Sequence, residues 1–211
     1  MSMRKIVLDI GSGASLPDVS TARSVVETVA RANTGKHQVV LKPQLFQNIP
    51  PNKPLRPRLA EEIATLCLGN SLGYAVSVFD RVSLDWALEM HDVSPLDHIK
   101  IACRPDLYWL AGEIPRKIPV HMSFDCRTQT SLDLPCKVDV ALGCVPEYPA
   151  SIDDYSSTLF RYSDHTVGLD IWKLNEPSVW EKHFVMQADD PSNPDSVGGF
   201  ALTPADLKDV L

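Results

Sequence analysis

Several features that would assign a chain to a special class are scarce or missing here. No run of about 18 apolar residues occurs, so no membrane-spanning helix is expected. The 20 Lys and Arg residues are outnumbered by 27 Asp and Glu and are not clustered, so we expect no nucleic-acid-binding surface. The five cysteines form no CxxC pair, and no signal-peptide core precedes them. We therefore expect reduced thiols and a cytoplasmic location.

The composition is that of an ordinary folded chain. Of the 211 residues, 44% are hydrophobic and 22% are charged, and the formal net charge is −7. This length and apolar content suit one domain over residues 1–211 with a sizeable core. We find neither an internal repeat nor a low-complexity segment, and the 17 prolines indicate many short connections.

Short apolar runs recur along the whole chain. Most are apolar on both faces and are bounded by Gly, Pro, Asp or Ser, which is typical of strands buried in a parallel sheet. The runs are Lys5–Ile10, Gln38–Leu41, Tyr74–Phe79, His98–Ala102, Pro119–Phe124, Val138–Val145, Phe160–Tyr162 and Val179–Val185.

Helical patterns alternate with these strands. Val19–Ala32 is the clearest, with Ser20 or Thr21 as its expected cap, and Leu59–Leu68 and Ser83–Met90 follow. Leu107–Ala111 and Ile152–Thr158 predict short helices at most. Eight strands in alternation predict an α/β fold, a small and trimmed (β/α)8 TIM-type barrel, with a doubly wound sheet as the alternative.

Polar side chains stand where the predicted strands end. Because the chemistry of a parallel barrel lies at the carboxyl ends of its strands, these residues are candidates for a site. Lysine and serine at such positions suit an anionic ligand, and a histidine beside an aspartate suits metal binding or proton transfer. The candidates include Asp9, Lys42, Gln44, Ser77, Lys100, Cys103, Ser123, Cys144, Ser163, Asp164, His165, Glu181 and His183.

Several of these residues lie in segments that resemble the sialic acid (N-acetylneuraminate) synthase family. Tyr162–Gly168 is similar to that family's GYSDHT-x-G segment, and Glu181–Phe184 is similar to its EKHF. Four further matches follow the same order: Asp9–Gly11 with EIG, Ile99–Cys103 with KIAS, Gly143–Pro149 with LHC…YP, and Leu202–Leu207 with LTPEEL. The resemblance covers almost the whole chain.

The resemblance implies a condensation of phosphoenolpyruvate with the aldehyde of an N-acetylated sugar, in carbohydrate biosynthesis. It assigns acid/base roles to Asp9 and Asp164 and a divalent metal, typically manganese, to His165. It assigns substrate contacts to Lys42, Gln44, Ser77, Lys100, Ser123 and Ser163. The expected partner is a small anionic substrate, with neither nucleic acid nor membrane, and a homo-oligomer is left open.

The sequence departs from the family at residues close to the chemistry. Gly143 occupies the position of a second metal-binding histidine, and Asp9 replaces a longer glutamate. Arg104 stands where the family has another glutamate. We also expect no counterpart of the family's C-terminal antifreeze-like domain after Leu211.

Two interpretations therefore stay open. In the first, the chain is a divergent synthase. In the second, it is a catalytically degenerate barrel kept as a structural or protein-interaction module, and Lys42 and Lys100 simply pair with Asp9 and Asp164. Similarly, Glu181 and Lys182 could form an ion pair beside a structural His183.

Overall fold

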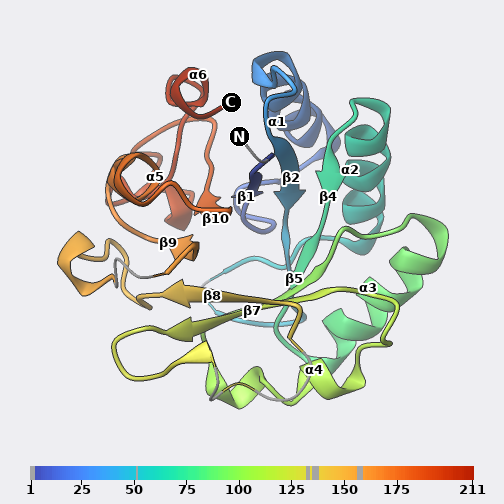
Figure 1. The fold of residues 1–211 in the computed structure, drawn as a ribbon. Coiled ribbons are helices and arrows are strands. Elements are labelled where there is room, and N and C mark those ends of the chain that lie inside the picture. Colours follow the sequence, from blue (N-terminus) through green and yellow to red (C-terminus); the bar gives the residue numbers. More distant parts are fainter. Residues whose placement is uncertain (1–2, 51, 132–133, 135–137, 156–158) are drawn as a thin grey trace.

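The strands form one parallel sheet that curls on itself (Figure 1). The computed structural model describes residues 3–50, 52–131, 134, 138–155 and 159–211. The strands are β1 Lys5–Asp9, β2 Gln38–Lys42, β3 Gln44–Leu45, β4 Gly73–Tyr74, β5 Val76–Val78, β6 Ile99–Ile101, β7 Val120–Asp125, β8 Val140–Cys144, β9 Arg161–Asp164 and β10 Val179–His183. Each of the eight predicted strand regions therefore overlaps a strand, and β9 extends two residues beyond the predicted Phe160–Tyr162.

The helices lie around the outside of the curled sheet (Figure 1). They are α1 Val19–Ala32, α2 Pro57–Gly69, α3 Arg81–Val93, α4 Leu110–Glu113, α5 Asp170–Asn175 and α6 Leu207–Val210. The three predicted long helices are confirmed, with α2 and α3 a few residues longer than expected. The predicted short helix over 107–111 is divided between a 3₁₀ turn, Pro105–Leu107, and α4. Of the segment predicted over 152–158, Ile152–Asp154 is a 3₁₀ turn and residues 156–158 lie outside the described residues.

The strand order is β3-β5-β6-β7-β8-β9-β10-β1-β2-β4. From β5 onward the order follows the chain and then returns to β1, without the reversal that marks a doubly wound sheet. Only Pro43 separates β2 from β3, and only Ala75 separates β4 from β5. The two ends of the order are β3, which continues β2, and β4, which leads into β5. Because β2 pairs with β4 and β3 pairs with β5, these two ends come together and the fold is barrel-like.

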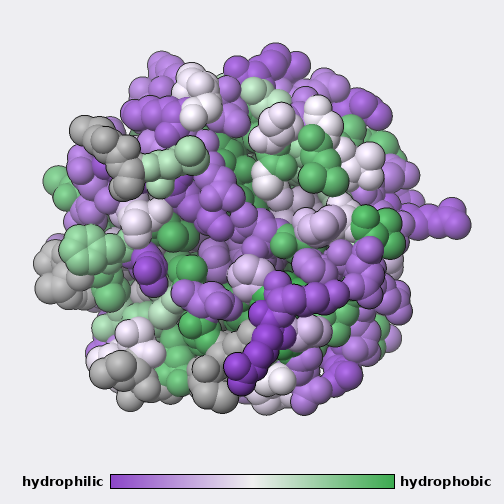
Figure 2. Space-filling model, turned by 45° about the vertical axis from the view of Figure 1, so that its right-hand side comes forward, coloured by the Kyte–Doolittle hydropathy of each residue, from purple (hydrophilic) through white to green (hydrophobic). Residues whose placement is uncertain are grey.

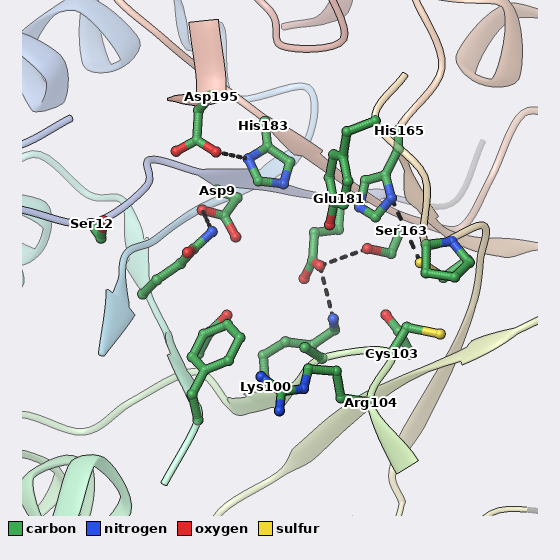
Figure 3. Close-up of a pocket in the computed structure, with 18 of the residues that line it drawn as sticks. Asp9, Ser12, Lys100, Cys103, Arg104, Ser163, His165, Glu181, His183 and Asp195 are labelled. Carbon is green, nitrogen blue, oxygen red and sulfur yellow. Dashed lines mark hydrogen bonds and ion pairs between the residues drawn. The ribbon is translucent and has the colours of Figure 1, made fainter. Parts of the chain in front are cut away.

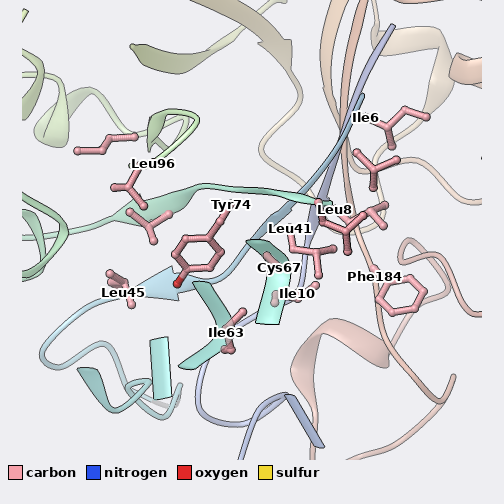
Figure 4. Packing of buried hydrophobic residues seen from close by; sticks show 14 of the residues in the cluster. Ile6, Leu8, Ile10, Leu41, Leu45, Ile63, Cys67, Tyr74, Leu96 and Phe184 are labelled. Atoms are coloured by element: carbon pink, nitrogen blue, oxygen red, sulfur yellow. The ribbon is translucent and has the colours of Figure 1, made fainter. Parts of the chain in front are cut away.

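Side-chain alternation divides the strands between two environments. Successive residues of a strand point to opposite faces of the sheet. Ile6 and Leu8 of β1 join the large cluster between sheet and helices, whereas Val7 belongs to a separate small cluster with Val40 and Ala75. In Figure 4, Ile63 and Cys67 of α2 lie near sheet residues of the large cluster. Burying each large aliphatic side chain of this kind contributes about 1.5–3 kcal/mol.

Two further findings concern the chain as a whole. Among the described residues, no helix has both the length and the apolar content that a membrane span needs. The cysteines in the described part of the chain form no disulfide, and Cys136 lies outside that part.

The cap of α1 differs from the prediction. Asp18, not Ser20 or Thr21, is the N-cap, and its carboxylate accepts a hydrogen bond of 2.8 Å from the Thr21 amide. The prediction was wrong because Ser20 and Thr21 already lie in the first turn of the helix. The N-cap is the residue before that turn, Asp18, whose backbone is still extended.

We expect Asp18→Ala to lower the free energy of unfolding by about 1 kcal/mol, because the Thr21 amide loses its acceptor. Ser20→Ala, two residues along, serves as the control and should change it by less than about 0.5 kcal/mol. Urea denaturation of both variants tests this, and equal losses would show that the Asp18 cap is not specific.

Candidate functional site

A cavity of about 620 Å³ opens at the carboxyl ends of the strands. Its wall is formed by inward-facing residues of several strands together with residues of the loops that follow them (Figure 3). The resemblance assigns roles to nine residues, and eight of them line the cavity: Asp9, Lys42, Gln44, Ser77, Lys100, Ser123, Ser163 and His165. The sequence therefore located the cavity correctly, although the roles of these residues stay predictions.

Lys42 and Asp9 form the first of two buried ion pairs in the cavity wall. Lys42 Nζ lies 2.5 Å from Asp9 Oδ2 and 2.6 Å from Ser77 Oγ. The other carboxylate oxygen of Asp9 accepts from the Gly11 amide at 2.9 Å and from Gln44 Nε2 at 3.1 Å. Burial alone would raise the pKa of Asp9, but the charge of Lys42 outweighs it and holds that pKa far below its usual range. Asp9 is therefore ionised and fixed by several donors.

Lys100 and Glu181 form the second pair. Lys100 Nζ lies 3.0 Å from Glu181 Oε1, which also accepts a 3.0 Å hydrogen bond from Ser163 Oγ (Figure 3). Glu181 Oε2 lies 3.9 Å from Lys42 Nζ and has no hydrogen-bond partner among the described residues. Burial raises the pKa of Glu181, but the two lysines outweigh burial and lower it to about 2.

This second pair corrects two expectations. Lys100 pairs with Glu181 and not with Asp164, and Glu181 does not pair with its neighbour Lys182. The reason is the alternation of β10: Glu181 faces the cavity, whereas Lys182 faces the opposite side and lies 3.1 Å from Asp164. Glu181 was a candidate at the end of a predicted strand but was assigned no substrate contact, and its register opposite Val7 of β1 places it on the inner face.

Asp164 does not line the cavity. Its Oδ2 accepts from the Trp180 indole at 2.9 Å, and its Oδ1 accepts from the amide and hydroxyl of Thr166. The side chains of Asp164 and Lys182 are both fully buried. These contacts hold Asp164 outside the cavity wall and suit a structural residue, so they give no support to its predicted acid/base role.

Two histidines and a tyrosine close the other side of the cavity. The Tyr148 ring stacks on His165 with 4.0 Å between ring centroids and lies edge-on to His183 at 5.7 Å. Burial lowers the pKa of His165 to about 3, and its Nδ1 lies 2.7 Å from the Val145 carbonyl oxygen. His165 is thus neutral, with Nδ1 donating to that carbonyl.

The pKa of His183 is shifted in the opposite direction. Burial lowers its pKa, but the carboxylates of Asp9 and Asp195 outweigh burial and raise it above the usual value. His183 Nδ1 lies 3.1 Å from Asp195 Oδ1. Pro194–Asp195 resembles the GPD segment of the same family, and Tyr148 lies in the LHC…YP match, but neither residue was assigned a role, so both were missed as cavity residues.

The expected metal at His165 finds few ligands. A Cβ at Gly143 would meet the Leu159 side chain at 2.2 Å, and Gly143 pairs in register with Tyr162, whose side chain is in the outer core. A histidine there would therefore point away from the cavity. In the described part of the chain, one group of three His, Cys, Asp or Glu side chains has ligand atoms within 4.8 Å of one another, and it does not include His165. The residues around His165 therefore do not fit the manganese site that the resemblance implies.

The inner wall is nearly balanced in charge. Asp9, Glu181 and Asp195 face Lys42, Lys100 and His183, and Arg104 also lines the cavity. An entering anion would therefore compete with the carboxylates for the hydrogen bonds that the two lysines donate in this structure. The hydroxyl of Ser123, buried beside them, has no hydrogen-bond partner within the described part of the chain and offers a further donor.

Comparison with known proteins gives a fold and no closer assignment. No family model matches the chain, and no curated protein matches it in sequence. It is similar to the crystal structure of N-acetylneuraminic acid (sialic acid) synthetase from Leptospira borgpetersenii serovar Hardjo-bovis in complex with citrate, with TM-score 0.75 and 17% identity over 99% of this chain and 81% of that one. It is also similar to a putative spore coat polysaccharide biosynthesis protein E from Chromobacterium violaceum ATCC 12472, with TM-score 0.73 and 16% identity over 98% and 72%. The resemblance predicted from the motifs is thus confirmed at the level of the fold.

Asp164→Ala should lower the free energy of unfolding by about 3–5 kcal/mol, because it leaves buried Lys182 without its counter-charge. The control is Asp106→Ala, which breaks an exposed pair with Arg104 and should cost less than about 1 kcal/mol. Thermal and urea denaturation measure both. Similar small losses in the two variants would contradict a structural role for Asp164.

The depressed pKa of Glu181 predicts a specific loss of stability in acid. A carboxylate with a lowered pKa stabilises the fold above its unfolded pKa, and this stabilisation disappears as the pH falls toward the folded value. From pH 6 to pH 3 we expect the wild type to lose about 2 kcal/mol more than Glu181→Gln, whose amide does not titrate. Urea denaturation across this range measures the difference, and parallel curves would mean that Glu181 is not held ionised.

Proposed function

We propose that the chain is a divergent enzyme of carbohydrate biosynthesis that condenses phosphoenolpyruvate with the aldehyde of an N-acetylated aldose. A bond forms between carbon 3 of phosphoenolpyruvate and the aldehyde carbon, and the aldehyde oxygen takes up a proton. Water adds to carbon 2, and inorganic phosphate leaves. The structural neighbours, one named a sialic acid synthetase and one a polysaccharide biosynthesis protein, support this class of reaction.

The observation that carries the proposal is the convergence of Lys42 and Lys100 in one enclosed cavity. Both ammonium groups are buried, and the hydroxyls of Ser77 and Ser123 lie in the same wall. A lysine ammonium has three donors, so each can divide them between its carboxylate partner and an entering anion. The citrate in the first structural neighbour is likewise a small anion. We assign carboxylate and phosphate binding to these four residues, with Gln44 and Ser163 as further polar contacts.

Asp9 and His183 are the groups suited to moving protons. Asp9 is ionised, and it can accept a proton from the attacking water once a bound anion shares the charge of Lys42, which otherwise keeps the pKa of Asp9 low. The carboxylates of Asp9 and Asp195 raise the pKa of His183, which favours its protonated form, and in that form it can donate a proton to the aldehyde oxygen. Neutral His165, covered by the Tyr148 ring, shapes the wall beside them. No step is assigned to manganese, because the residues around His165 do not form its ligand set.

The architecture of the whole chain is part of the proposal. Counting β2 with β3 and β4 with β5 gives eight strands in a closed ring, a trimmed (β/α)8 barrel, and residues 1–211 would form this single domain. Small barrels of this type place their active sites at the strand ends where the cavity lies.

A second candidate is a barrel that binds a small anion without turnover, or a barrel kept as an interaction module. The pairing of both lysines with carboxylates and the missing ligand set at His165 favour it. Against an interaction module, Figure 2 shows apolar side chains in small separate groups among hydrophilic ones, and no broad apolar patch, on the face drawn.

The test is calorimetric titration of phosphoenolpyruvate into the wild type, Lys42→Met and Lys100→Met. Because a hydrogen bond to a charged group contributes about 1.5–3 kcal/mol, each variant should bind about 10- to 100-fold more weakly. Lys117→Met, which removes an exposed lysine paired with Asp92, is the matched control and should bind as the wild type does.

Turnover is tested separately, by measuring phosphate released when N-acetylated aldoses are added with phosphoenolpyruvate. Release that requires both substrates supports the synthase. Binding without release for any aldose favours the anion-binding module. The absence of binding in the wild type would contradict the assignment of Lys42 and Lys100.

A further inference from the structure

A second polar cluster lies at the opposite end of the strands from the cavity. His98 comes directly before β6, and His121 is the second residue of β7. Asp97 precedes His98 and contacts Lys5 and Gln38, the first residues of β1 and β2. These residues lie where strands begin, whereas the cavity of the proposed function lies where they end. The cluster therefore calls for an account independent of that function.

The two histidines are buried and incompletely hydrogen-bonded. His98 is 0% exposed and His121 is 1% exposed. His98 Nε2 and His121 Nδ1 have no hydrogen-bond partner among the described residues. Buried polar atoms are nearly always partnered, because an unpaired one loses its hydrogen bonds to water without replacement. Two such nitrogens on touching rings indicate that this site accommodates something that binds both.

The third member of the cluster is a carboxylate held in place by several donors. Asp97 Oδ1 lies 2.7 Å from His98 Nδ1 and 2.6 Å from Lys5 Nζ, and Asp97 Oδ2 accepts from Gln38 Nε2 at 2.7 Å. One ligand atom from each of Asp97, His98 and His121 lies within 4.8 Å of the others. Two imidazoles and a carboxylate at this separation are a common ligand set for zinc and similar metals.

We propose that Asp97, His98 and His121 bind a divalent transition-metal ion of the zinc and cobalt class, through one ring nitrogen of each histidine and a carboxylate oxygen. Three protein ligands leave a fourth position for water. The position at the amino-terminal end of the strands separates the ion from the cavity, because the active sites of barrels lie at the opposite face. Binding to the folded state alone should raise stability.

Binding requires one local movement. The rings of His98 and His121 are stacked with centroids 3.5 Å apart and planes 11° apart. A metal lies in the plane of the ring that binds it, so parallel rings cannot share an ion until one turns about its Cβ–Cγ bond. Lys5 opposes binding as well, because its ammonium group occupies Asp97 Oδ1. Both features predict how the site should respond to substitution.

The test is titration of chelator-treated protein with Zn²⁺ by calorimetry and with Co²⁺ by absorption spectroscopy. We expect one equivalent to bind with a tetrahedral Co²⁺ spectrum and to raise the Tm. His121→Phe keeps the ring volume but offers no ligand nitrogen, so it should bind at least tenfold more weakly. Lys5→Met should bind more tightly than the wild type, because the competing cation is gone.

His165→Ala is the control that separates this site from the cavity. It should bind Zn²⁺ as the wild type does, while His98→Phe should lose binding. If a histidine variant fails to fold, ring ¹⁵N NMR of the wild type still identifies which of its histidines shift with Zn²⁺. Loss of binding in His165→Ala but not in His121→Phe would overturn the proposal, and so would the absence of Zn²⁺ binding in the wild type.

Discussion

Two lysine–carboxylate pairs buried inside a curled parallel sheet set the main constraint on this structure. Each charge of Lys42–Asp9 and Lys100–Glu181 has lost its water, a cost that is offset only by close opposite charges and additional hydrogen bonds. Ser77, Gln44 and Ser163 supply those bonds, so the strands must hold a fixed register for the network to be satisfied. Such an interior is no better for stability than an apolar one would be, which is why we attribute it to ligand binding.

The two-residue alternation of the strands decides which charges belong to this network. Glu181 and His183 of β10 face inward with Asp9 and Lys42, while Lys182 between them faces the helices and pairs with Asp164. One strand thus contributes to two separate charge systems, one at the cavity and one in the outer core. The same alternation places His121 and Ser123, two residues apart, on the inner side of β7. Ser123 belongs to the cavity wall, and His121 belongs to the cluster at the start of the strands.

Much of the fold could be predicted from the sequence, because strands buried on both faces read as short apolar runs that need no tertiary information. The cavity lysines were predictable for a related reason: they stand at strand ends, and parallel strand ends meet. The Lys42–Asp9 pair was among the stated alternatives, but the partner of Lys100 was not, since Glu181 is selected by strand register 81 residues further along the chain. Asp195, the partner of His183, depends on how a loop packs. His98 and His121 lie inside or beside apolar runs and looked like core positions until the fold brought their rings together. The absence of a histidine at Gly143 was visible, but only the packing of Leu159 shows that the position faces outward.

The central claim is that the inner lysines exchange part of their carboxylate contacts for a bound anion. A crystal structure of the protein soaked with phosphoenolpyruvate tests this most directly. The account predicts ligand carboxylate or phosphate oxygens within hydrogen-bond distance of the Lys42 and Lys100 ammonium groups, with the separation of Lys100 and Glu181 increased from 3.0 Å. An empty cavity with both ion pairs unchanged, at phosphoenolpyruvate concentrations that saturate the calorimetric titration, would contradict it.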